Sequence, residues 1–269
     1  KRRWLLFRAA TLELEAGNVA LGRDKLQALY EADEFDHHGA NAMYEAAKLL
    51  DAEDPSTARA MRLRTIRRYP DQVAADFALK DIVNAELARD EVAASRALAA
   101  TLEELHAEVP DTEVGDNLLF QLGRIQDVEL HQDDAALDNY RAIFRDYREG
   151  PLADDALWEL AAIYRRHQAW QPAIDALTIL ADDRESSWFI GSYDSAWVDD
   201  AIFELGLIHL LRLEDYPRAV YWFERYLKEF GTGVHADDAG WHIVQTHRLA
   251  GDDAAYREAL RDFARDFPE

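Results

Sequence analysis

Residues 154–161, DDALWELA, decide the fold of this chain, because the same stretch returns twice in nearly the same form. The copies are DDAIFELG at 199–206 and DDAGWHIV at 237–244, and DNLLFQLG at 116–123 follows the same pattern. Acidic or polar residues come first, and an apolar, an aromatic, a polar, an aliphatic and a small residue close the pattern. A segment that recurs in this way indicates a repeat architecture.

Weaker copies extend the pattern towards the start of the chain. They are DFALKDIV at 76–83, ANAMYEAA at 40–47, and a first helix that joins through Phe7, Ala9 and Ala10. Seven units therefore begin near residues 3, 40, 76, 116, 154, 199 and 237, so that successive starts lie 37, 36, 40, 38, 45 and 38 residues apart. Each unit has room for two helices of about 14 residues and two short turns.

Composition agrees with an all-α fold. Hydrophobic residues make up 49% of the 269, and there are only 12 glycines and 7 prolines. Alanine and leucine, which favour helices, dominate. We predict a single elongated domain over 1–269, with seven helix–turn–helix repeats and an insertion at about 184–195.

The breaks fall at the expected places. Turns within units are predicted at 17–18, 53–55, 132–134 and 251–253, and boundaries between units at 69–71, 109–111, 150–151 and 231–233. These stretches contain glycine, proline, asparagine or aspartate, which end helices and form turns.

The units resemble the tetratricopeptide repeat, whose period is about 34 residues and whose helices cross at small residues. Ala161 and Gly206 take the small-residue site, and the second helix of the last unit matches with Leu260 and Phe263 as core residues. The resemblance implies a right-handed α-solenoid in which neighbouring helix pairs stack. Gly240 departs from the pattern, because a large residue is usual there.

The longer period and the junctions between units are also similar to those of bacterial cell-envelope repeat proteins. These are outer-membrane assembly lipoproteins and the coordinator associated with the Tol-Pal system. This second resemblance implies a periplasmic or cell-envelope location, with a cytoplasmic location as the alternative.

In the tetratricopeptide family the first helix of each pair lines a concave groove. Counted from each unit's start, the resemblance implies that positions 2, 5, 9 and 12 face this groove. Position 5 is aromatic in six of the seven units, and the residues there are Phe7, Tyr44, Lys80, Phe120, Trp158, Phe203 and Trp241. Such a ladder suits an extended peptide or an amphipathic helix. Alternatively, the rings pack between adjacent first helices.

Position 2 becomes acidic in the later units, at Asp155, Asp200 and Asp238. Paired aspartates at a helix start stabilise the helix dipole and cap free amides. Together with the aromatic rings, they could also attract a basic, apolar segment of a partner. The predicted partner-binding residues on the first helices are Tyr44, Phe120, Trp158, Phe203, Trp241, Asp155 and Asp200.

The insertion between the fifth and sixth units contains SSWFIGSYDSAW, residues 186–197. Two interpretations are open. The apolar residues could fold back over the second helix of the fifth unit, or Trp188 and Tyr193 could contact a partner. Asp194 and Ser195 are predicted to cap an early-starting helix that carries Trp197.

The formal charge of −23 disfavours partners that are polyanions, and the alternative is that the acidity only keeps the protein soluble. A field of this sign repels nucleic-acid phosphates and anionic membrane surfaces. No apolar run approaches the length of about 20 residues that a membrane-spanning helix needs, so direct membrane insertion is not expected.

No catalytic motif and no cysteine is present. HExxH, a glycine-rich phosphate loop and the GxSxG turn are all missing, and the nine histidines show no ligand spacing. His209 and His247 stand where the repeat pattern takes a tyrosine-sized residue, which favours core packing. We therefore expect no catalytic residue, no bound metal and no cofactor.

The sequence thus predicts a non-enzymatic scaffold that binds a protein partner, a peptide or a helix, in its groove. The alternative is a helical accessory region of a larger enzyme, such as a lytic transglycosylase-like protein. The amphipathic last helix, 254–267, is followed by no polar capping helix, so we expect either further chain or a partner against it. Self-association is a third possibility.

Overall fold

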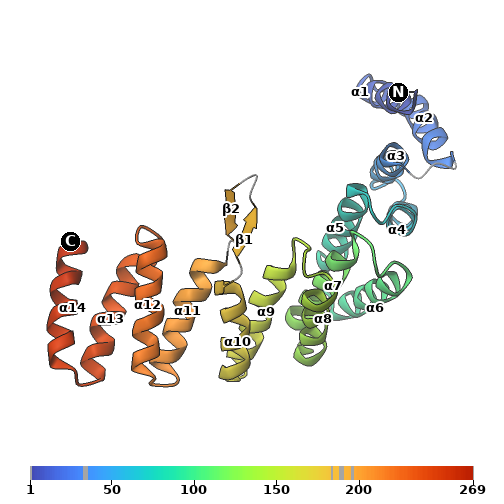
Figure 1. Ribbon diagram of the computed structural model, residues 1–269. Coiled ribbons are helices and arrows are strands. Elements are labelled where there is room, and N and C mark those ends of the chain that lie inside the picture. The colour runs from blue at the N-terminus through green and yellow to red at the C-terminus, as the bar shows by residue number, and fades with distance from the viewer. Residues whose placement is uncertain (1, 33–35, 183, 188–190, 195–196, 269) are drawn as a thin grey trace. The chain divides into compact units, whose positions relative to one another are not determined.

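The computed structural model describes residues 2–32, 36–182, 184–187, 191–194 and 197–268. The described residues form an all-α solenoid of successive helix pairs, as the sequence predicts (Figure 1). One β-hairpin, which was not predicted, lies in the insertion. They group into two compact units, 1–143 and 144–269, which divide within α8. That one superhelix runs through both stays a prediction.

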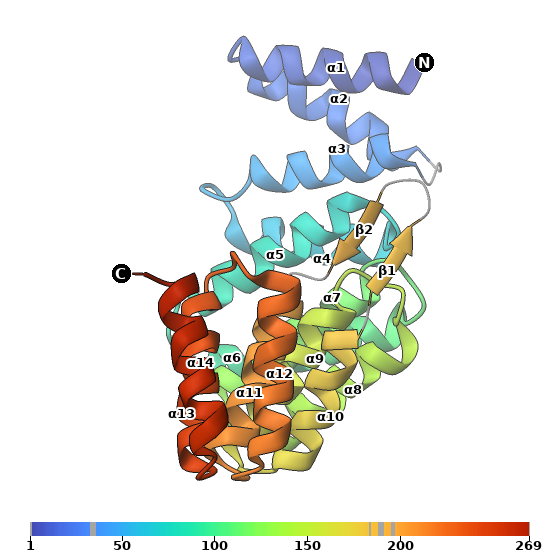
Figure 2. The same ribbon diagram turned by 60° about the vertical axis from the view of Figure 1, so that its left-hand side comes forward.

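The first compact unit holds four of the predicted repeats. Its helices are α1 (Arg2–Glu15), α2 (Val19–Glu31), α3 (His37–Lys48), α4 (Pro55–Arg68), α5 (Val73–Leu87), α6 (Val92–Glu108), α7 (Gly115–Arg124) and the start of α8 (Asp133–Asp146). From α1 to α7, each helix packs against the next (Figure 2). A π-helical turn, η1 (Ile125–Glu129), continues α7 and was not predicted.

The second compact unit holds the remaining three repeats. Its helices are α9 (Ala153–Arg166), α10 (Trp170–Asp182), α11 (Val198–Leu211), α12 (Tyr216–Phe230), α13 (Ala236–Leu249) and α14 (Asp253–Asp266). They lie side by side in chain order in Figure 1, each packed against the next.

Aspartate N-caps start several second helices. Asp54, Asp215 and Asp252 each accept a hydrogen bond from a backbone N–H three residues later. The first helices of the later repeats start differently. Their paired aspartates lie within the first turn, and the residues at the N-cap positions make no side-chain cap. These aspartates therefore stabilise the helix dipole but are not N-caps, which corrects part of the prediction.

Small residues let the paired helices cross closely. A Cβ built on Gly206 would lie 2.5 Å from Cε1 of Phe223, and one on Gly123 would lie 2.8 Å from Cε1 of Tyr140. Phe223 and Tyr140 are fully buried. The predicted role of the small-residue position is confirmed.

The last helix differs from its prediction. All of α14 is described and none of its residues is buried, and Leu260, a predicted core residue, is 38% exposed. The reason is that α14 packs mainly on α13, so that only one side of it is covered.

The insertion is a β-hairpin. β1 (Arg184–Ser187) and β2 (Gly191–Asp194) pair antiparallel, from Arg184 opposite Asp194 to Ser187 opposite Gly191. The strands lie beyond the ends of α10 and α11 (Figure 1). Because the backbone is extended as far as Asp194, α11 begins only at Val198 with Trp197 at its N-cap position. The predicted helix start at Asp194 is therefore wrong, and Ser195 lies outside the described residues.

Candidate partner-binding surfaces

The aromatic residues at position 5 each pack against another ring. Phe120 contacts Tyr140 at 5.7 Å between ring centroids, within its own repeat. Tyr44 stacks on Phe77 of the following first helix at 5.9 Å. Trp241 packs against Phe263 of α14 at 5.5 Å and remains 42% exposed.

Trp158 forms a more elaborate contact. Its ring lies 4.8 Å from that of Trp197 with only 10° between the planes. The indole N–H of Trp197 donates to Oδ1 of Asp155 over 2.7 Å. Asp155 and Trp158 are three residues apart on α9 and share one face of the helix, so together they hold the ring that precedes α11.

The same arrangement recurs one repeat later. His235, at the N-cap position of α13, stacks on Phe203 at 4.4 Å and 10°. Its Nε2 lies 3.1 Å from Oδ1 of Asp200. In both places an aspartate and an aromatic residue three positions later contact a ring that lies just before the next first helix. We call this arrangement the ring clasp. The sequence carries a signal for it, because Trp197 and His235 each lie two residues before the start of a predicted unit.

The ring clasp gives several predicted contact residues a structural role. Phe203 is only 8% exposed and has little surface to offer a partner. Asp155 and Asp200 are already engaged by the next repeat. Trp188 lies outside the described residues, and of Tyr193 only the place of its backbone in β2 is described.

Open surface lies instead in grooves between consecutive first helices. In the first compact unit a groove of about 830 Å³ runs between α3, the start of α4, and α5. Tyr44 and Ala85 provide apolar surface. The ammonium group of Lys48 lies over the Tyr44 ring, 5.5 Å from its centroid.

A buried arginine organises this groove. Arg62 is 8% exposed and makes two hydrogen bonds of 2.6 Å to Asp51 and one of 3.2 Å to Asp81. Hydrogen bonding to Asp51 raises the pKa of Arg62, so its charge is permanent. Desolvation, together with the neighbouring Asp81, raises the pKa of Tyr44 to about 12, so its hydroxyl remains a donor.

The second compact unit has an equivalent groove of about 490 Å³ between α9, the start of α10, and α11. Leu207 and Leu211 line it with the Trp170 ring, over which Arg212 lies at 5.5 Å. Arg165 lies over Trp158 at 5.2 Å and pairs with Glu204.

Cations outnumber acids in both groove linings, although the chain carries −23. The groove in the first unit is lined by Lys48, Arg59, Arg62 and Arg89 against Asp51, Asp81 and Glu86. The groove in the second unit is lined by Arg165, Arg166 and Arg212 against Glu204. These cations come from late first-helix positions and from second helices, where the sequence pattern does not point to them.

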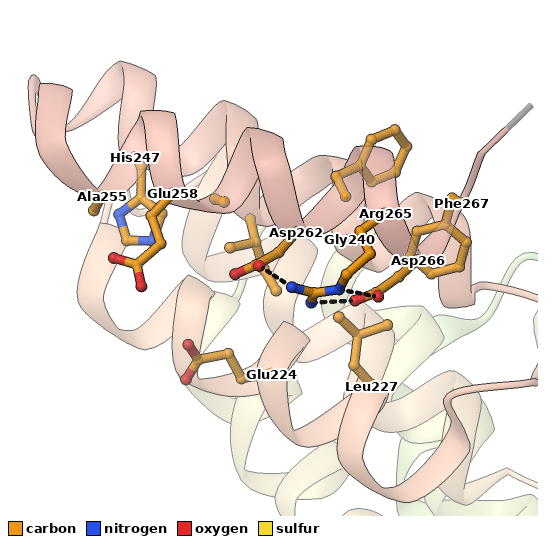
Figure 3. A pocket seen from close by; sticks show the side chains of 13 residues that line it. Glu224, Leu227, Gly240, His247, Ala255, Glu258, Asp262, Arg265, Asp266 and Phe267 are labelled. Atoms are coloured by element: carbon orange, nitrogen blue, oxygen red, sulfur yellow. Dashed lines mark hydrogen bonds and ion pairs between the residues drawn. The ribbon is translucent and has the colours of Figure 1, made fainter.

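In a third hollow, acidic residues outnumber cations. A cleft of about 450 Å³ lies between α12 and α14 with α13 beneath it (Figure 3). Its apolar lining includes Leu227, Ile243, Phe263 and Phe267. Its charged lining is formed by Glu224, Glu258, Asp262, Asp266 and Arg265.

The histidines play structural parts. His209 is 2% exposed, as core packing requires, whereas His247 lies half-buried at the acidic cleft. Among the described residues there is no group of three or more histidines and carboxylates that could hold a metal ion. None of the described helices combines the length and the apolar character that crossing a membrane requires.

Comparison with known proteins supports the fold. No protein-family model and no curated protein matches the chain. The solved structure of BtubC from P. vanneervenii is 16% identical, covers 90% of each chain and gives a TM-score of 0.51. PilW, a type IV pilus biogenesis factor, is 13% identical over 85% of this chain and 94% of its own, with a TM-score of 0.47.

A tetratricopeptide repeat protein from Parabacteroides merdae is another of the solved structures that match. It is 10% identical, and the match covers 98% of this chain and 79% of that one with a TM-score of 0.34. At these identities the likeness concerns the fold alone.

Proposed function

We propose that the protein is a non-enzymatic scaffold that binds a partner peptide or helix in the grooves between its consecutive first helices. The observation that carries the proposal is the recurrence of one groove at equivalent positions in two repeats. Each groove combines apolar surface, an aromatic ring and a cation above that ring. Recognition sites for extended peptides share this mixture of anchors and charged groups.

The groove linings also bear on the chemistry of the partner. The acidic starts of the first helices favour a basic, apolar partner, but Asp155 and Asp200 are engaged in ring clasps. Arg62 and Arg165 are already paired with acids of their own grooves. Lys48, Arg89 and Arg212 are exposed at the grooves, and cations of this kind bind carboxylates. We therefore propose a partner segment that has apolar anchor residues and acidic side chains between them.

A peptide selection tests the proposal. Random linear peptides displayed on phage are selected on the folded protein, and each selected peptide is titrated by fluorescence anisotropy. Leu207→Glu and Ala85→Glu place a negative charge in the two grooves. Each should weaken binding of the peptides that use its groove by about tenfold or more.

Leu213→Glu is the matched control, because Leu213 is 41% exposed and lies outside both grooves. If the selected peptides bind both groove variants as tightly as the original protein, the grooves are not the binding surface.

The compartment belongs to the same proposal. The resemblance of the unit junctions to those of envelope repeat proteins supports a bacterial cell-envelope location. Fractionation of the source cells with an antibody against the protein tests it, and recovery in the cytoplasmic fraction would contradict it.

A further inference from the structure

We infer that the protein associates with a second copy of itself, and that the exposed face of α1 in one copy occupies the acidic cleft between α12 and α14 of the other. The inference uses neither groove of the proposed function and stands independently of it. Both surfaces lie on this chain, so each can be changed separately.

The cleft has apolar residues in its lining that can contact an apolar side chain of a partner. Leu227 of α12 and Phe267, which follows α14, lie on it (Figure 3), and Ile243 of α13 and Phe263 of α14 complete the apolar lining. Its volume of about 450 Å³ is in the range of sites that take a small ligand or a large side chain. On the α14 side of the cleft, Glu258, Arg265 and Asp266 are exposed.

The rim of the cleft is acidic. Glu224, Glu258, Asp262 and Asp266 surround it, and Arg265 is the one arginine in its lining. Arg265 binds Asp262 over 2.7 Å and Asp266 over 2.8 Å (Figure 3). Glu224 and Glu258 are exposed. The rim therefore favours an occupant that carries positive charge next to its apolar anchor.

The face of α1 has this character. Trp4, Leu5 and Leu12 are 53%, 58% and 49% exposed. Trp4, Arg8 and Leu12 are spaced four residues apart, so they follow one another along a single face of the helix. Arg8 is exposed between the apolar residues, and its contact with Glu15 is long, at 3.7 Å. Exposed apolar groups gathered around a charge mark an interaction surface.

Complementary charge and apolar character favour this pairing. Trp4 supplies the apolar anchor, and Arg8, one turn further along α1, meets the acidic rim. Because the two surfaces differ, the contact is heterologous: each copy that uses one surface leaves its other surface free, and further copies can add.

Sedimentation velocity over a range of protein concentrations tests the inference on the 269-residue chain. The weight-average mass should rise with concentration, because each association event joins further copies. A mass that stays at that of one chain throughout would overturn the inference.

Two variants separate the surfaces. Leu5→Glu on α1 and Glu258→Lys on the rim should each raise the dissociation constant by about tenfold or more. Val73→Glu and Glu214→Lys are their matched controls, because Val73 is 64% exposed on α5 and Glu214 is exposed in the turn before α12. Both controls should associate like the original protein, and circular dichroism should show equal helix content for all four variants.

Mixing the two variants gives the decisive result. Leu5→Glu retains an intact cleft and Glu258→Lys retains an intact α1, so a mixture should form a dimer with one copy of each and nothing larger. If the mixture stays monomeric while the original protein associates, or if either single variant associates undiminished, the pairing of these two surfaces is wrong.

Discussion

At Gly206 the two helices of the sixth repeat come so close that a single methyl group would collide with a ring. The Cβ position lies 2.5 Å from Phe223, a fully buried residue. Gly123 and Tyr140 repeat this pairing in the fourth repeat. Glycine at the crossing is therefore matched to an aromatic residue on the second helix.

This pairing gives a first prediction. Gly206→Ala should lower the free energy of unfolding by about 1–3 kcal/mol, because overpacking forces the ring or the backbone to move. Urea unfolding followed by circular dichroism measures the change. In a Phe223→Leu background the same substitution should cost much less, since the ring edge is gone. If Gly206→Ala lowers the free energy of unfolding equally in both backgrounds, a clash between the added methyl group and the Phe223 ring is not the cause.

Gly240 shows why one residue departs from the repeat pattern. A Cβ there would lie 2.9 Å from Phe267 and 3.1 Å from Phe263. The large residue usual at this position is thus replaced by rings that reach over from α14. The sequence shows the departure, but only the packing shows what fills the space.

His209 gives a prediction about pH. Burial lowers the pKa of His209, and its Nδ1 has no hydrogen-bond partner among the described residues. The unfolded chain, with a histidine pKa near 6.5, therefore binds the proton more readily than the folded one. The free energy of unfolding should fall as the pH drops below about 6.5, and level off below the folded pKa.

Urea titrations at a series of pH values measure this dependence. In His209→Phe the slope between neutral and mildly acidic pH should be smaller, whatever the variant's absolute stability. An unchanged slope would assign the effect to other groups.

At the scale of elements, the ring clasp joins one first helix to the next. An aspartate and an aromatic residue on α9 hold Trp197, and the same two positions of α11 hold His235. The residues that the sequence offers as a partner-binding ladder thus serve in part to connect neighbouring repeats. This agrees with the alternative that the rings pack between adjacent first helices.

The clasp is open to a double-mutant test. Trp197→Phe keeps a ring on Trp158 but removes the hydrogen bond to Asp155, and should cost about 0.5–1.5 kcal/mol of unfolding free energy. Asp155→Ala combined with it should be less than additive, because both changes remove one interaction.

The control for this cycle pairs Asp155→Ala with His235→Phe, which lies in the next clasp. Those two changes should add within about 0.5 kcal/mol. Additivity in the Trp197 cycle would show that the hydrogen bond does not contribute to stability.

For the whole molecule, charge is the dominant global property. Acidic residues number 53 against 30 lysines and arginines, for a net charge of −23. Repulsion among like charges destabilises a compact state. We therefore expect the melting temperature to rise when NaCl is increased from about 0.02 M to about 0.5 M, because salt screens the repulsion.

Differential scanning fluorimetry at several salt concentrations measures this effect. The ion pairs of α4, such as Arg67 with Glu108 and Arg59 with Glu86, would be weakened by the same salt. A melting temperature that falls with salt would mean that these pairs outweigh the global repulsion.

Much of the fold follows from periodicity. The repeat starts, the turns and the small residues at helix crossings are local patterns, and the structure confirms the helix pairs from them. The candidate site was harder to predict from the sequence. The ring clasps join residues about 40 positions apart, and the groove cations come from parts of the repeat that show no regular pattern.

The sequence by itself determined an all-α array of helix pairs, because each pair must bury an apolar face with the same spacing of small and large residues. Only the tertiary structure decided which rings and carboxylates remain available. Trp158 and Asp155 are engaged by Trp197, while Lys48 and Arg212 are exposed in open grooves. The physical reason is that availability depends on the contacts of a side chain with the next repeat, which its own helix does not specify.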